Sequence, residues 1–331
     1  ETSLVTNLQG SGVGKLTLGD SLSDISAQVD ISALNFTADY QRIPFPIKVE
    51  DGKVEFSRNS VSVRDLQGSI GDSLFSKLAF RANLAGSDED VSQGSDRIEL
   101  ELDGTFEEGF VAWLSKTFSV PEAYTVRTPL LLSDAKIGWQ KDARNSFKGD
   151  VSIKDGPDLT LDVDWQKGQL SVHKLNLKDQ YSDVVSALDY SADGMTLKFS
   201  GVLQNETLEA MFVDLGFGKG RVEGNFSLKS DEVKPVGLLA SGDLQGTNLL
   251  LTLPAGDTLA IDRVTLSAKG SLVDADLSKI LWRDMAWDPV KATIDFSRDK
   301  PQVTVTEAKL CGLDAPGLLT IDGQNLALDI T

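Results

Sequence analysis

The fold is decided by the stretch TIDFSRDKPQVTVTEAKLCG, which runs from Thr293 to Gly312. It contains two segments in which apolar and polar residues alternate, separated by a polar turn, which is the pattern of a β-hairpin with one buried face. The same outline recurs around Phe56 and around Trp165, which take the place that Phe296 holds in this stretch. The three aromatic residues are widely and unevenly spaced, so we predict a diverged repeat of one hairpin and not a short-period solenoid.

The composition is that of a folded and strongly acidic protein. The 331 residues are 40% hydrophobic and 25% charged, and the formal net charge at pH 7 is −18. A negative charge of this size has the wrong sign for nucleic acid or for anionic lipid headgroups, so we expect no nucleic-acid partner. The single cysteine, Cys311, allows no internal disulfide. The sequence contains no apolar run of about 18 residues that would predict a membrane-spanning helix.

Alternation with a period of two dominates the chain, for example at Ile98–Leu102 and at Leu159–Trp165. Each run is bounded by Gly, Asp, Asn or Ser, and roughly twenty strands of ordinary length fit into the sequence. Such strands bury one face and leave the other in water, so we expect a mainly β fold built as an antiparallel meander. The repeats divide the chain into three β modules, residues 1–104, 105–218 and 219–331.

Two stretches break this period and are predicted to be short helices, at residues 106–118 and 206–215. At the start of the first, Thr105 to Glu108 has the sequence of a capping box. Its large apolar residues fall on one helical face, which favours a helix that closes the end of a sheet or groove. These residues are Phe106, Phe110, Trp113, Leu114 and Phe118. The segment Leu277–Trp287 also satisfies a helical spacing, and we expect a short helical turn there before a strand.

No complete catalytic or metal-binding motif is present. His173 is the only histidine, which excludes a multi-histidine metal centre and makes any Ser-His-Asp set depend on one residue of an alternating strand. Cys311 follows an alternating strand, where a free cysteine usually serves as a small hydrophobic residue. The stretch Gly10–Lys15 lacks the first Gly and the final Ser or Thr of a phosphate-binding loop. We therefore predict no catalytic residue, no metal site, no cofactor and no enzymatic activity.

The sequence resembles the AsmA-like family, which includes the TamB-like and YhdP-like proteins of bacterial envelopes. Three segments carry the resemblance: FEEGFVAWL from Phe106, TPLLL from Thr128 and EAKLCGL from Glu307. The resemblance implies an elongated, curled antiparallel sheet that forms an open, taco-like groove in the periplasm. It further implies bridge-like transport of phospholipid between the inner and outer membranes, in support of outer-membrane integrity. Members are tethered to the inner membrane, and this chain shows no such anchor, so we expect an internal or C-terminal piece.

An apolar groove suits such transport on physical grounds. An acyl chain in water is exposed at a cost of about 0.8 kcal/mol per CH₂ group, and a continuous apolar trough removes this cost. A curled antiparallel sheet provides a trough because every second residue points to its concave face. We expect the groove to be lined by Leu100, Leu102, Leu161, Val163, Leu249, Leu251 and Leu253, and to be closed at its end by the helix that carries Phe106, Phe110, Trp113 and Leu114.

Other interpretations of the same pattern remain open. Alternation fits a sealed sandwich core as well as it fits an open groove. The chain could instead be an envelope assembly scaffold that offers a sheet edge to client proteins, or a β-rich surface adhesin. Five Trp and four Tyr residues give an adhesin little support. Phospholipid acyl chains are thus the expected ligand, with envelope proteins as further partners.

Overall fold

The computed structural model describes residues 5–17, 28–57, 60–83, 97–117, 119–140, 144–215, 218–231, 237–252, 257–297, 301–310, 312–314, 316–322 and 325–330. The chain divides into two compact units. Unit 1 comprises Glu1–Pro121, Arg127–Lys154 and Thr160–Gln166, and unit 2 comprises Glu122–Val126, Asp155–Leu159 and Lys167–Thr331. The division into three modules follows the sequence repeats and stays a prediction.

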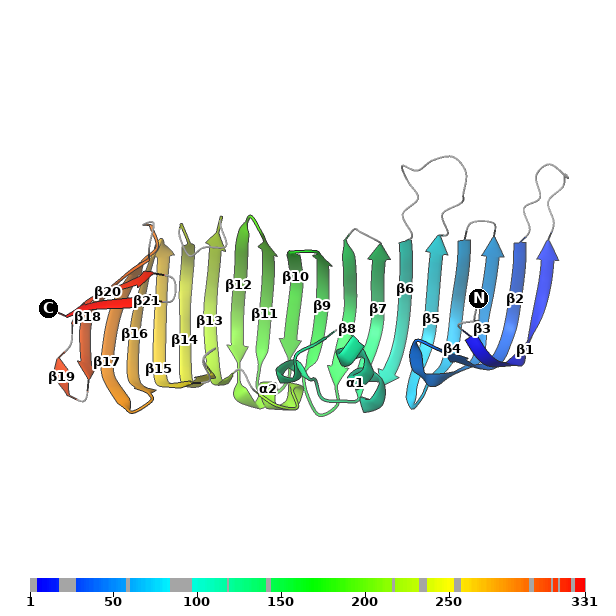
Figure 1. Ribbon diagram of the computed structural model, residues 1–331, viewed down its shortest axis with the longest axis horizontal. Helices are drawn as coiled ribbons and strands as arrows, with labels where there is room; N and C mark the ends of the chain where they lie inside the picture. Colours follow the sequence, from blue (N-terminus) through cyan, green and yellow to red (C-terminus); the bar gives the residue numbers. More distant parts are fainter. Residues whose placement is uncertain are drawn as a thin grey trace. The chain divides into compact units, whose positions relative to one another are not determined.

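Strands make up most of both units (Figure 1). In unit 1 they are β1 (Val5–Thr17), β2 (Gln28–Tyr40), β3 (Ile43–Ser57), β4 (Ser60–Ile70), β5 (Ser73–Asn83), β6 (Arg97–Phe106), β7 (Leu130–Gln140), β8 (Asn145–Ile153) and most of β9 (Asp158–Gln166). In unit 2 they are β10 (Gln169–Lys178), β11 (Asp183–Ser191), β12 (Gly194–Leu203), β13 (Gly218–Ser230), β14 (Leu239–Thr252), β15 (Thr258–Gly270), β16 (Leu272–Trp282), β17 (Met285–Asp295), β18 (Gln302–Leu310), β19 (Leu313–Asp314), β20 (Gly317–Asp322) and β21 (Asn325–Ile330). The helices are α1 (Glu108–Thr117) in unit 1, and α2 (Asn205–Met211) with the 3₁₀ helix η1 (Glu122–Tyr124) in unit 2.

The pairing is that of an antiparallel meander. In unit 1, each of the strands β1 to β7 pairs antiparallel with the next strand along the chain. In unit 2, β10 to β18 do the same. The hairpins predicted around Phe56 and Phe296 are present as β3–β4 and β17–β18. The prediction of a mainly β, antiparallel fold with short helices is therefore confirmed.

The sheet of unit 1 has an apolar face and a charged face. Cross-strand neighbours share a face, and Phe80, Leu100 and Ile137 are neighbours across β5, β6 and β7. On the other face, Lys136 Nζ lies 3.0 Å from Glu101 Oε1. One cluster of buried residues comprises Leu34, Val49 and Phe75.

Unit 2 repeats this arrangement. Leu244, Leu266 and Ala275 are apolar neighbours across β14, β15 and β16, whereas Lys279 Nζ lies 3.2 Å from Asp262 Oδ2 on the charged face. The buried core contains Leu238, Ala240, Ala268 and Val273. Strands β2 to β8 of unit 1 and β10 to β18 of unit 2 stand side by side in sequence order (Figure 1). Within the described ranges no second sheet of the same unit covers the apolar face, and many of its side chains are only half buried.

Local backbone irregularities shift the alternation within several strands. Lys279 has a φ of 46°, and the buried positions of β16 move by one residue there. As a result, Leu277 and Ile280 both pair with apolar residues of β15 although they are three positions apart. This spacing imitates a helical period, so the prediction of a helical turn within Leu277–Trp287 was wrong: β16 continues to Trp282.

A buried polar network holds α2 to the sheet of unit 2. Thr207 is fully buried, and its Oγ1 lies 2.6 Å from Ser182 Oγ. Ser182 Oγ also accepts a hydrogen bond from the Gln204 N–H at 2.9 Å. The helix predicted at residues 206–215 is therefore present but shorter, because Phe212 is extended and pairs with Val126.

Candidate functional site

Helix α1 follows β6 almost directly and is fixed at its start by the sheet. The Glu107 N–H donates to Ser73 Oγ at 3.0 Å, and the Val111 N–H donates to the Glu107 carbonyl at 3.1 Å. The prediction of a capping box at Thr105 was wrong, because β6 continues through this residue and pairs it with Leu131 of β7. The predicted helix is present, but it begins later than its sequence pattern indicated.

Aromatic rings pack α1 against β3 and β6 of unit 1. Phe110 stacks on Phe106 with the ring centroids 5.4 Å apart, and Trp113 lies 5.4 Å from Phe110. Phe45 of β3 contacts both helix residues, with centroid distances of 6.2 Å to Phe110 and 6.3 Å to Trp113. Ring pairs at these distances stabilise the contact beyond the area that they bury.

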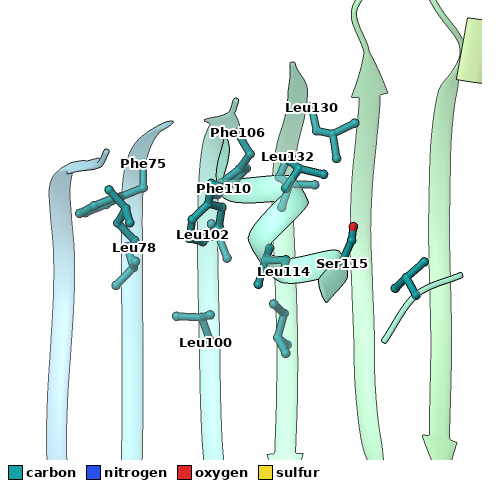
Figure 2. A pocket seen from close by; sticks show the side chains of 14 residues that line it. Phe75, Leu78, Leu100, Leu102, Phe106, Phe110, Leu114, Ser115, Leu130 and Leu132 are labelled. Atoms are coloured by element: carbon teal, nitrogen blue, oxygen red, sulfur yellow. The ribbon is translucent and has the colours of Figure 1, made fainter. Parts of the chain in front are cut away.

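An apolar pocket of about 380 Å³ lies between α1 and the apolar face of unit 1 (Figure 2). Thirteen of its fourteen lining residues are apolar, and Ser115 is the only polar one. They come from β4 to β7, from α1 and from the segment that follows it: Ile70, Phe75, Leu78, Leu100, Leu102, Phe106, Phe110, Val111, Leu114, Ser115, Val120, Leu130, Leu132 and Ile137. Ligand sites in proteins are concave pockets lined mostly by apolar side chains, so this pocket is the candidate binding site.

The lining determines which chemistry the pocket can accept. None of the described lining residues is titratable, and Ser115 carries the only hydroxyl among them, so this lining supplies no group for general acid–base catalysis. A peptide or a sugar would lose hydrogen bonds to water there without replacing them, which costs free energy for each buried polar group. A hydrocarbon chain has no such groups and gains from leaving water. The pocket is therefore suited to hydrocarbon.

The structure brings together part of the predicted groove lining. Leu100 and Leu102 line the pocket with Phe106, Phe110 and Leu114, whereas Trp113 packs in the aromatic cluster and is not among the pocket-lining residues. The other predicted groove residues lie elsewhere: Leu161 and Val163 are half buried on β9, Leu249 is half buried and Leu251 exposed on β14, and Leu253 lies outside the described residues.

Several lining residues were missed in the sequence, among them Phe75, Val111, Leu130 and Leu132. The run Leu130–Leu132 was noticed only as part of the family resemblance. Its apolar composition directly after Pro129 was the available local signal. Phe75 gave no signal, because its place in the pocket depends on the pairing of β5 with β6.

The position of α1 differs from the expected groove end. It connects β6 to β7, with β1 to β5 before it and β8 after it in unit 1. The pocket that it covers is lined by β4 to β7. The helix thus covers strands from the middle of the strand order of unit 1, and it lies at one end of these strands. It does not lie beside the first or the last strand.

The strands that line the pocket carry charged side chains on the opposite face of their sheet. Asp103 Oδ2 accepts a hydrogen bond from Lys77 Nζ at 2.7 Å, and its Oδ1 accepts one from the Asp134 N–H at 2.7 Å. The hydrogen bond from Lys77 has the largest effect and that from the Asp134 N–H the next largest. Both lower the pKa of the Asp103 carboxyl below its ordinary value. Asp103 is thus paired with neighbouring strands on the charged face, and it is not among the pocket-lining residues.

Within the described ranges, no group of three or more His, Cys, Asp or Glu side chains is placed to hold a metal ion. None of the helices in the same ranges is long and apolar enough to cross a membrane. Comparison with models of protein families, with curated proteins and with solved structures found no match for this chain. The features of this protein that bear on its function are the apolar pocket and the sheets with one apolar and one charged face.

Proposed function

We propose that this protein binds phospholipid acyl chains on the apolar faces of its sheets and takes part in periplasmic phospholipid transport between the inner and outer bacterial membranes. The observation that carries the proposal is the apolar pocket beneath α1, with its single polar lining residue. At about 0.8 kcal/mol per CH₂ group, moving even half of an acyl chain out of water into such a site is strongly favourable.

The two-faced sheets support the same function. A one-layer sheet with an apolar face normally needs a second layer to bury that face, and the described strands of each unit supply none. Acyl chains supply equivalent cover. The net charge of −18 disfavours adsorption to anionic membranes, so a shuttle or bridge for single lipids fits better than a surface-bound protein. The periplasmic location and the inner-membrane tether rest on the resemblance to AsmA-like proteins alone.

Filling the pocket tests this function. Val111 is buried and lines the pocket, whereas its neighbour Ala112 is exposed. We expect Val111→Trp to lose most of the phospholipid that co-purifies with the protein, because the indole occupies the space of the chain. Ala112→Trp is the matched control and should retain it. Mass spectrometry of extracted lipid measures both. An absence of phospholipid from the parent protein, or equal lipid in both variants, would refute lipid binding at this pocket.

One observation favours the scaffold as a second candidate. All thirteen residues of β1 are exposed, including Leu8, Val13 and Leu16, and β1 contains no acidic residue in a chain of net charge −18. An exposed strand of this kind can pair with an extended client strand. Pairing of a client strand with β1 should be unaffected by Val111→Trp and blocked by Leu8→Lys. The pocket variants therefore also distinguish lipid binding from the scaffold function.

A further inference from the structure

The pocket beneath α1 is closed at one end and open at the other. Phe75, Leu102 and Val111 are buried at the closed end, next to the helix. Leu100 and Ile137, which are cross-strand neighbours, are only half buried. Because Leu102 and Leu100 are successive apolar positions of β6, burial decreases along the strand with distance from α1. The pocket therefore opens along β6 and β7.

This opening leads to a row of half-exposed aromatic residues. The next apolar pair after Leu100 and Ile137 is Ile98 and Trp139. Trp139 of β7 is 42% exposed, and Phe56 of β3 and Trp165 of β9 are 41% and 40% exposed. All three stand on the apolar face near the carboxyl ends of their strands. We name Phe56, Trp139 and Trp165 the aromatic rim.

Trp165 belongs to the apolar face by the alternation of β9. Thr160 and Asp162 of the same strand bond Asp150 and Lys148 of β8, at 2.6 Å and 2.9 Å. Lys148 is the cross-strand neighbour of Lys136 on the charged face. Trp165 is separated from Thr160 and from Asp162 by an odd number of positions along β9. Its side chain therefore points to the opposite, apolar face. Half-exposed indoles at an apolar boundary are typical of the level at which lipid headgroups begin.

The stretch of β6 from Leu102, the first buried residue reached from the open end, to the rim matches one lipid leaflet. Strands rise about 3.4 Å per residue, so the four residues from Leu102 to Ile98 span about 14 Å. The hydrocarbon core of a bilayer is about 30 Å thick, which leaves about 15 Å for the chains of one leaflet. A phospholipid chain that ends against Leu102 therefore reaches its ester groups at the level of Trp139.

The charges at the start of α1 favour the same orientation of the bound lipid. Asp72, Glu107 and Glu108 line one cleft at the start of α1. Three carboxylates there repel a phosphate group and oppose a lipid oriented with its headgroup beneath the helix. At the other end, the indole N–H of tryptophan can donate a hydrogen bond to ester or phosphate oxygens.

We propose that unit 1 binds one phospholipid chain along β6 and β7 in a single orientation, with the terminal methyl beneath α1 and the headgroup at the aromatic rim. This inference rests on the proposed lipid-binding function and adds the direction of the lipid. It assigns the site to a phosphate-bearing, two-ended amphiphile. A free alkane would not distinguish the two ends.

Native tryptophans at both ends make the orientation measurable. Two variants keep a single tryptophan, Trp113 on α1 or Trp139 at the rim, with the others changed to Phe. Each is loaded with phosphatidylcholine that carries a nitroxide quencher on the acyl chain, either near the carbonyl or near the terminal methyl. We expect Trp139 to lose more fluorescence to the label near the carbonyl, and Trp113 to lose more to the label near the methyl. A variant with only Trp165 is the matched control and should follow Trp139.

The possible outcomes distinguish a failure of the proposed orientation from a failure of lipid binding itself. If lipid is bound but the order is reversed, or is the same for both tryptophans, the orientation is overturned and lipid binding stands. If mass spectrometry finds no bound lipid in the parent, both fail. Should the single-tryptophan variants not fold, Trp113→Phe and Trp139→Phe are compared singly with the parent. The loss of methyl-end quenching in the first variant and of carbonyl-end quenching in the second is then expected, and any other assignment refutes the orientation.

Discussion

Single residues at the bulges of unit 1 connect strands that are distant in the sequence. Lys77 and Asp134 both have positive φ, near 50°, and the strand register shifts beside each of them. Asp103 of β6 lies between them and bonds the side chain of the first and the backbone of the second. The sequence offered no sign of this role, because the three residues are far apart in the chain and their proximity follows from strand pairing.

The Asp103 carboxylate should contribute stability that depends on pH. Its pKa is lowered in the folded state, so the contribution is fully present above the ordinary carboxyl value, near 4, and is lost as pH falls through the lower folded value. We expect Asp103→Asn to reduce the free energy of unfolding at pH 7 by less than about 1 kcal/mol, because the pair is partly exposed. Urea unfolding at several pH values measures this.

The control is Asp183→Asn, which removes the ion pair with Lys178 (2.9 Å), where both side chains are mostly exposed. It should leave unfolding unchanged at every pH. A difference between Asp103→Asn and the parent that persists unchanged at pH values well below 4 would contradict the assignment to the charged carboxylate.

Local patterns identified the elements of this chain better than their boundaries. The apolar spacing of Phe110, Trp113 and Leu114 predicted α1 correctly, since a helical face is encoded within a dozen residues. Its start was missed because Ser73, which receives the Glu107 N–H, belongs to another strand. Backbone irregularities caused the opposite error in β16, where a shift of the alternation imitated a helix. Positive φ at a non-glycine residue cannot be read from such a pattern.

One of these positive-φ residues can be relieved by mutation. Ala33 of β2 has a φ of 52° and lies opposite a register shift in β1. The left-handed conformation costs a residue with a Cβ roughly 1–2 kcal/mol, and glycine loses about 0.5–1 kcal/mol in chain entropy. We expect Ala33→Gly to stabilise unit 1 by about 0.5–1 kcal/mol in urea unfolding.

Ala38 of the same strand provides the control, because it is buried and its φ is not positive. Ala38→Gly should destabilise the protein, since it removes a buried methyl group and adds chain entropy without relieving strain. If both glycine variants lower stability equally, the strain at Ala33 is not the reason for its sensitivity.

At the scale of the whole molecule, alternation predicted the two faces but not what lies over them. Leu100 and Leu102, which were predicted to line a groove, lie in the pocket beneath α1, whereas the other predicted groove residues do not. Residues such as Phe75 and Leu132 reach the same pocket only through the order of strand pairing. The choice between open groove and sandwich core was equally non-local. Strands β2 to β8 and β10 to β18 stand side by side in sequence order within their units, which favours a face that is accessible to a ligand.

Two neighbours on β14 provide the sharpest test of such a face in unit 2. Leu251 is 37% exposed and its cross-strand neighbour is Leu259, whereas Leu250 is 40% exposed on the opposite side. If the apolar face is an open trough, Leu251→Asp should keep the melting temperature, because the carboxylate reaches water, and should abolish lipid crosslinking from a photoreactive residue at position 249. Leu250→Asp adds the same charge to the other face and should leave crosslinking unchanged.

Val273, which is 6% exposed in the core cluster of unit 2, calibrates the stability side of this test. An aspartate there has no route to water, so Val273→Asp should cost several kcal/mol or prevent folding. If the face is an open trough, Leu251→Asp should be more stable than Val273→Asp. It should also lose the lipid crosslinking that Leu250→Asp retains. If Leu251→Asp unfolds the protein as Val273→Asp does, the face is sealed, because only a buried carboxylate carries that penalty.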